Sequence, residues 1–367
     1  MVTAADPFVD VPEQAPAKQL LSAALAGGPA NAYLLHGPAG VRKTAAARAF
    51  AAGILGDADL AAGRRSVHPD LYVLEPLGEM IRIDEIRAMR HDLHLRPFEA
   101  DRRVYLVLSA HLMNEDAADA LLKDLEEPPA YATIVLVADE LGPLPETIRS
   151  RCQLVPFHRL SDAAVREWLG AHAPELDDTT AMTIVRSAGG RLDRAERLLD
   201  PDASRRREAL VVAARSVYLD EAFEPRDAAA VVLESMTAAG AEAKEAEEAE
   251  VERRELAGKD AEQRVKRAQR GAERDELLAS LEELAAWYRD LVVVSAGAER
   301  AVVHADRLAE LREDAGHGVA AEKAAKLARE AWRAAEEFNV NAPLALEALF
   351  VRLHRTFGLR STRGLAP

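Results

Sequence analysis

The sequence predicts an α/β fold, a parallel sheet with helices on both faces, followed by helical domains. Three observations predict it. The first half alternates short apolar runs with amphipathic stretches. After Pro156 only helical spacing of apolar residues remains. The chain, at 367 residues, is also too long for one ordinary core. We therefore expect an α/β core at 1–157, a small helical domain at 158–202 and an all-helical domain at 203–367.

Four segments of the first half have the length and apolar content of buried strands. They are residues 33–36, 71–75, 104–108 and 133–138. Amphipathic stretches at 45–55 and 117–127 lie between them in the pattern of helices. Because the carboxyl ends of parallel strands gather at one edge of the sheet, a ligand site is expected at that edge.

The second half begins with a compact helical pattern. Ser161 is a plausible N-cap, and Gly189 with Gly190 separates two helices. Residues 240–275 are charged and rich in alanine, with few apolar positions. This segment predicts a solvated helix or a projecting helical hairpin, with breaks or bends at Gly258 and Gly271. A partner-binding or nucleic-acid-binding arm is the alternative.

The composition is that of a globular protein, with 49% hydrophobic and 30% charged residues. The formal net charge of -15 argues against binding DNA by bulk electrostatics. Cys152 is the only cysteine, which excludes an internal disulfide and a cysteine-based zinc module. No leader-like or membrane-spanning run is evident, and a cytoplasmic location is expected.

The stretch HGPAGVRKT at residues 36–44 has the context of a phosphate-binding loop between a strand and a helix. In such loops backbone N–H groups surround phosphate, the lysine reaches the terminal phosphates and the hydroxyl residue ligates Mg²⁺. Arg42 occupies the place of the glycine before the lysine, where a side chain restricts the backbone. The loop is therefore degenerate, and weak nucleotide binding is an alternative to none. The candidate nucleotide-binding residues are Gly37, Gly40, Lys43 and Thr44.

ATP hydrolysis also requires a carboxylate at the end of a neighbouring strand. The strand at 104–108 ends in Leu108 and is followed by Ser109. Glu115 and Asp116 come later, after Asn114, where acids commonly complement a helix N-terminus. We therefore do not expect this chain to turn over ATP by itself.

The most specific segments are LLKDLEEPP at 121–129 and LPETIRSRC at 144–152. With the flanking sequence, they resemble the AAA+ core of bacterial clamp-loader subunits. The resemblance extends over nearly the whole chain. It implies an AAA+ core at 1–157, a helical lid at 158–202 and a collar domain at 203–367, with 240–275 as a charged helical insertion. The family's four-cysteine zinc insertion is reduced to GDADLAAGRRSV, so neither zinc nor any other metal is expected.

Departures from the family pattern concern the handling of ATP. Besides Arg42, the sensor strand ends in Ala138 and Asp139 where Thr or Asn is usual, and Asp193 stands where the second sensor's arginine would align. This profile resembles the delta-prime type, the non-catalytic stator of the DNA polymerase III clamp loader. The resemblance implies a subunit of a DNA-directed DNA polymerase holoenzyme, a nucleotidyltransferase, that is not catalytic on its own.

The preserved element is Ser150, Arg151 and Cys152. The resemblance implies that Arg151 is an arginine finger, presented in trans to ATP held by a neighbouring subunit, with Ser150 and Cys152 as its motif. It also implies gamma/tau ATPase subunits, a delta subunit, the beta sliding clamp and primed DNA as partners. Three alternatives remain: an active gamma/tau-type ATPase, a stand-alone AAA+-like scaffold, and a loop on which Arg149 and Arg151 are ordinary surface arginines.

Overall fold

The computed structural model describes residues 6–61, 68–76, 80–139, 141–253, 258–338 and 340–358. The chain forms two compact units. Unit 1 contains Met1–Glu175 and Ala188–Ala195, and unit 2 contains Leu176–Ser187 and Glu196–Pro367. The residues of the expected lid are thus divided between both units, and the three-domain division remains a prediction.

Unit 1 contains a five-stranded parallel sheet in the order β2-β3-β4-β1-β5. Its strands are β1 (Ala32–His36), β2 (Leu71–Leu74), β3 (Arg103–Val107), β4 (Ala132–Ala138) and β5 (Gln153–Pro156). The four expected strands are present. The sequence analysis missed β5 because this edge strand has four residues, exposes Gln153 and Leu154, and ends in Pro156.

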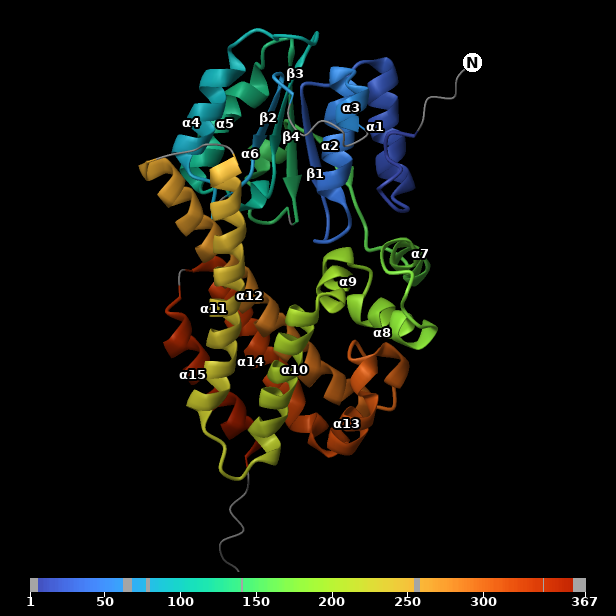
Figure 1. Cartoon of the computed structure of the whole chain (residues 1–367), viewed down its shortest axis with the longest axis vertical. Helices are drawn as coiled ribbons and strands as arrows, with labels where there is room; N and C mark the ends of the chain where they lie inside the picture. Colours follow the sequence, from blue (N-terminus) through green and yellow to red (C-terminus); the bar gives the residue numbers. More distant parts are fainter. Residues whose placement is uncertain are drawn as a thin grey trace, which may run out of the picture. The chain divides into compact units, whose positions relative to one another are not determined.

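Helices cover both faces of this sheet, with α1–α3 on one side and α4 and α5 on the other (Figure 1). Alternation along the strands explains the two cores, because Tyr33 and Leu35 join one apolar cluster while Leu34 joins the other. The helices of this unit are α1 (Ala15–Gly27), α2 (Lys43–Leu55), α3 (Ala58–Ala61), α4 (Ile83–Leu93), α5 (Glu115–Glu126), α6 (Glu146–Arg149) and α7 (Asp162–His172), with a 3-10 turn η1 (Ala110–Leu112).

Unit 2 is helical throughout its described residues. Its core centres on the fully buried aromatic side chains of Trp287, Tyr288 and Phe350. The elements that follow unit 1 in the chain are α8 (Asp178–Ala188), α9 (Leu192–Leu199), α10 (Pro201–Leu219), α11 (Pro225–Arg253), α12 (Lys259–Ser295), α13 (Leu308–Glu313), α14 (Gly318–Glu337) and α15 (Ala342–Phe357), with 3-10 turns η2 (Glu299–Ala301), η3 (Ala305–Arg307) and η4 (Asp314–His317). Helix α9 contributes residues to both units.

The charged segment at 240–275 lies in a helical hairpin formed by α11 and α12, which pack side by side (Figure 1). Arg264 pairs with Glu247 across the two helices. The predicted break at Gly258 is confirmed, since this residue has a φ of 81° and α12 begins immediately after it. Gly271 does not break the helix, because this glycine lies within α12, and a bend there stays a prediction.

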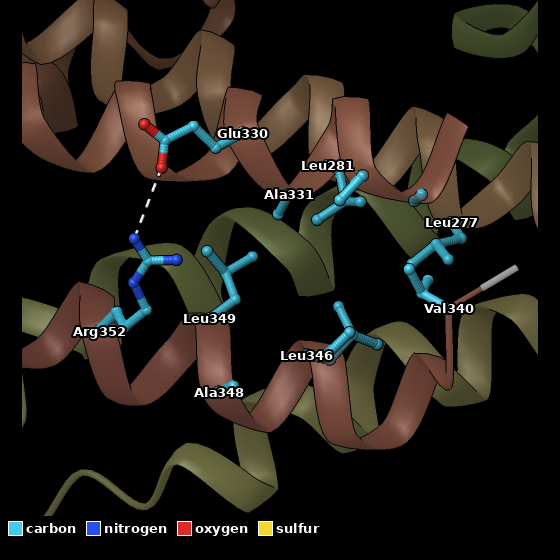
Figure 2. A pocket seen from close by; sticks show the side chains of 12 residues that line it. Leu277, Leu281, Glu330, Ala331, Val340, Leu346, Ala348, Leu349 and Arg352 are labelled. Carbon is cyan, nitrogen blue, oxygen red and sulfur yellow. Dashed lines mark hydrogen bonds and ion pairs between the residues drawn. The ribbon is translucent and has the colours of Figure 1, made fainter. Parts of the chain in front are cut away.

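Unit 2 also contains an apolar pocket of about 210 Å³ between α12, α14 and α15 (Figure 2). Among the described residues that line it, only Glu330 and Arg352 are charged, and they pair with each other at an Oε2–Nη2 distance of 3.5 Å. The pocket therefore offers no group arranged for acid–base chemistry. In the described ranges, no helix combines the length and hydropathy needed to cross a membrane.

Candidate functional site

The phosphate-loop segment, residues 37–44, connects β1 to the first turn of α2. Gly37 has a φ of +142°, and a Cβ there would lie 2.2 Å from the carbonyl oxygen of Phe157. Gly40 has a φ of +71°, and a Cβ there would overlap the side chain of Asp193. Both positions thus require glycine because neighbouring groups pack directly against the backbone.

Arg42 adopts the left-handed conformation that a glycine would supply, with φ 67° and ψ 27°. Such a conformation costs a non-glycine residue about 1–2 kcal/mol. Its guanidinium lies over the ring of Trp168, with Cζ 5.5 Å from the ring centroid, a favourable cation–π arrangement. The arginine therefore does not prevent the left-handed turn, although the sequence suggested that a side chain would restrict this backbone.

Lys43 is held by groups of its own domain. Its side chain is 3% exposed, and Nζ lies 2.8 Å from Oδ1 of Asp139. Nζ also donates to the carbonyl oxygens of Gly37, at 2.8 Å, and Pro38. A lysine ammonium has three N–H donors, and these three acceptors account for all of them. Lys43 could reach a phosphate only by giving up an existing partner.

Two carboxylates lie beside the phosphate-loop segment. Asp139 pairs with Lys43, and Asp193 packs on Gly40. Burial alone would raise the pKa of Asp193, but hydrogen bonds and charge from Arg191, with Nη2 2.7 Å from Oδ2, outweigh burial and lower it. Burial lowers the pKa of Lys43, and the charge of Asp139 opposes that shift. Each carboxylate beside the loop is thus paired with a cation of the same domain, Asp139 with Lys43 and Asp193 with Arg191.

The remaining candidate nucleotide residues do not complete a site. Thr44 is exposed at the start of α2. Leu108 is buried directly after β3, and Ser109 has a left-handed φ of 52°, so the strand end presents no carboxylate. Glu115 and Asp116 begin α5 beyond Asn114, whose Oδ1 accepts the N–H of Ala117 at 2.9 Å. Because Lys43 is bound by internal acceptors and no carboxylate follows β3 directly, these residues do not fit a nucleoside triphosphate with Mg²⁺.

Arg151 lies just beyond α6 with its guanidinium held by fixed acceptors. Nε donates to Oε1 of Glu126 at 2.8 Å, and Nη2 pairs with the same oxygen. Nη1 donates to the carbonyl oxygen of Thr147 at 2.8 Å. The side chain nevertheless remains 33% exposed. In the described part of the chain, the neighbouring Arg149 has a buried Nε without a hydrogen-bond partner.

The two residues that flank Arg151 support its loop. Ser150 caps α6, since its N–H donates to the carbonyl oxygen of Glu146 at 2.9 Å. Cys152 is partly buried against the apolar cluster beneath α4 and α5, and burial raises the pKa of its thiol to about 12. A thiol with that pKa stays protonated at neutral pH and is a poor nucleophile.

Comparison with known proteins identifies the first half of the chain. Residues 13–161 match the family model described as "DNA polymerase III, delta subunit". The DNA polymerase III subunit delta′ of Pseudomonas aeruginosa is 35% identical over 182 residues, 46% of this chain and 56% of that protein. The delta′ subunit of Bacillus subtilis is 35% identical over 102 residues, 28% of this chain and 31% of that protein.

Residues 13–161, which we name the clamp-loader domain after this similarity, are thus similar to clamp-loader subunits of the delta-prime type. The tau subunit of Bacillus subtilis is also similar, at 29% identity over 50% of this chain and 35% of that protein. The chain thus matches about half or less of the length of these relatives. Among solved structures, a gamma subunit-related protein of Thermotoga maritima covers 94% of this chain and all of its own, at 18% identity and a TM-score of 0.42.

Two contacts of the clamp-loader domain were missed by the sequence analysis. Asp139 was noted only as a departure from the sensor pattern, whereas its carboxylate is the partner of Lys43. Glu126 was noted only as part of the LEEPP run, whereas it holds Arg151. Both pairs join residues far apart in the chain. Two sequence signals could have indicated these contacts. Asp139 is a carboxylate directly after β4, which is the strand next to β1, and Glu126 is an acid within the motif at 121–129.

Proposed function

We propose that this chain is the non-catalytic delta-prime subunit of a DNA polymerase III clamp loader. In this role it does not hydrolyse ATP but presents Arg151 to ATP held by a neighbouring gamma/tau subunit. A planar, always charged guanidinium suits that role because it neutralises negative charge that develops in phosphoryl transfer. Its partners would be gamma/tau and delta subunits, the beta clamp and primed DNA, in the cytoplasm.

One observation carries this proposal, the contrast between two cations of the clamp-loader domain. All three donors of Lys43 are directed to acceptors in its own domain, and its side chain is 3% exposed. Arg151 sits in the preserved SRC sequence, a third exposed, in an orientation fixed by Glu126 and Thr147. The first arrangement disfavours nucleotide binding in cis, and the second favours a contact in trans.

Assembly and turnover test the proposal together. The chain should co-purify with gamma/tau and delta subunits. In that complex Arg151→Ala should leave assembly intact and slow turnover at the adjacent ATP site by about a thousandfold, the low end for a lost arginine finger. Arg151→Lys should rescue little, since it keeps the charge but loses the planar fork.

Three results would argue against it. Failure to assemble would favour a stand-alone scaffold. ATP hydrolysis by the purified chain, abolished by Lys43→Ala, would favour an active gamma/tau-type ATPase. An unchanged turnover in the Arg151→Ala complex would remove the finger from the mechanism.

A further inference from the structure

The geometry points to Glu126 as the positioning residue of Arg151. This inference rests on the proposed function, because it assigns a role to the contact that holds the proposed finger. Glu126 is the last residue of α5, and Arg151 follows α6. Their contact therefore joins the motifs at 121–129 and 144–152 through two residues that are 25 positions apart in the chain. The carboxylate of Glu126 orients the guanidinium, and Glu126 itself would touch no nucleotide.

The hydrogen bonds show which edge of the Arg151 guanidinium binds Glu126 and which edge faces away from it. Oε1 of Glu126 accepts from both Nε and Nη2, the side edge of the fork. Thr147 takes one N–H of Nη1 through its carbonyl oxygen, and Oγ of Ser150 is a longer contact at 3.4 Å. Because Arg has five N–H donors, Nη2 retains one hydrogen for a further acceptor, and the second hydrogen of Nη1 has only the 3.4 Å contact with Ser150 to give up. A phosphate oxygen would therefore meet the outer edge, Nη1 and Nη2.

The platform under this pair is rigid. Leu125, next to Glu126, is 5% exposed, and Ile148, near Arg151, is completely buried in the same apolar cluster. Pro128 follows within two residues of Glu126 and keeps α5 from continuing. The backbone on both sides of the ion pair is thus fixed by packing, and the pair transmits that fixed position to the guanidinium.

Stability does not account for the pair. Glu126 is 49% exposed and Arg151 33% exposed, and exposed ion pairs contribute little to folding. Without these contacts, the partly exposed side chain of Arg151 would adopt many conformations in solvent. The hydrogen bonds to Glu126, Thr147 and Ser150 remove that freedom before a phosphate arrives, which favours the reaction by orientation.

The test uses the reconstituted clamp-loader complex with variants of this chain. Glu126→Ala is expected to lower kcat at the adjacent ATP site by roughly tenfold with KM unchanged, the size expected when a residue that orients a functional group is lost. Glu126→Gln keeps an oxygen acceptor at the same reach and should retain more than half of kcat. Glu127→Ala is the matched control, because this exposed acid pairs with no cation in the described part of the chain. It should behave as wild type.

The inference is overturned if the kcat of the Glu126→Ala complex equals that of wild type, or if Glu126→Ala and Glu127→Ala lower kcat equally. It is also overturned if Glu126→Gln lowers kcat as much as Glu126→Ala does. A higher kcat for Glu126→Ala than for wild type would overturn it too, because the ion pair would then inhibit turnover. Arg151→Ala in the same assay distinguishes failure of the proposed function from failure of the positioning role of Glu126. If Arg151→Ala has no effect, the proposed function fails. If it slows turnover while Glu126→Ala does not, only the positioning role fails.

Discussion

Lys43 and Arg151 are cations of the same domain at two motif positions, and their surroundings are opposite. Lys43 is 3% exposed and bound by Asp139 and two loop carbonyls. Arg151 is 33% exposed and held by acceptors that leave its outer edge for a further partner. The motif lysine is thus bound within its own domain, while the motif arginine stays partly exposed, as its proposed role in trans requires.

The phosphate-loop segment is held by contacts within its own domain that involve no nucleotide. Its glycines are required by packing, and Lys43 neutralises Asp139. These contacts give the residues a role in stability that does not depend on nucleotide. The loop of Ser150, Arg151 and Cys152 has no comparable role in stability, because the ion pair of Arg151 with Glu126 is partly exposed and contributes little to folding.

The largest expected effect concerns Cys152, next to Arg151. Burial raises the pKa of its thiol to about 12, so the thiolate fraction at pH 8 should be about a thousandfold below that of a free cysteine. Alkylation of the folded chain should be correspondingly slow and should rise about tenfold for each pH unit up to that pKa. The chain has one cysteine, so mass spectrometry reads it without ambiguity.

The unfolded chain in guanidinium is the control and should react at an ordinary rate. Rapid alkylation of the folded chain at pH 8 would contradict a purely packing role for Cys152 beside the arginine.

The next effect concerns the packing of the loop. Gly37→Ala should lower the free energy of unfolding of unit 1 by about 2–4 kcal/mol, because the φ is unfavourable and the Cβ would overlap Phe157. Gly56→Ala is the matched control, since Gly56 also has a positive φ, +67°, but nothing lies within 4 Å of its Cβ position. It should cost about 1 kcal/mol.

Hydrogen exchange of β1 and β4 amides measures both variants. If both variants lose the same free energy of unfolding, the phosphate-loop segment is not held by packing. The contrast between this segment and the loop of Ser150, Arg151 and Cys152 would then have no structural basis.

The smallest effect concerns the ion pair of Lys43. Asp139→Asn should lower the free energy of unfolding by about 1–2 kcal/mol, because it leaves a buried ammonium without its counter-charge, an effect reduced by the 41% exposure of Asp139. Asp84→Asn is the control, since Asp84 and Arg87 form a pair that is 86% and 63% exposed. It should change stability by less than about 0.5 kcal/mol. Hydrogen exchange compares them, and equal effects would show that Asp139 is not a structural partner.

The fold was predictable where local patterns determine it. The four expected strands, the N-cap at Ser161 and the glycine pair before α9 follow from local composition, and Ser161 Oγ does accept the N–H of Ala164. The edge strand β5 was not predictable, because its stability comes from pairing with β1 rather than from its own residues. The continuity of α12 through Gly271 depends on packing against neighbouring helices, which outweighs the low helix propensity of one glycine.

The candidate site was predictable in its motifs but not in its partners. Motif spacing predicted a role for Lys43, the family resemblance predicted one for Arg151, and Arg42 and Leu108 were noted as departures from the pattern of an ATP site. Sequence spacing could not show that Asp139 binds Lys43 or that Glu126 binds Arg151, because both contacts depend on the tertiary arrangement of distant segments.

ATP turnover by the reconstituted complex, measured side by side for Lys43→Met and Arg151→Ala, tests the central claim most directly. Lys43→Met keeps the length of the side chain and removes the charge. We expect complexes with this variant to turn over ATP as wild type does, and complexes with Arg151→Ala to lose the turnover of the adjacent site. The reverse pattern, loss with Lys43→Met and none with Arg151→Ala, would contradict the claim that this chain completes a neighbour's site and has none of its own.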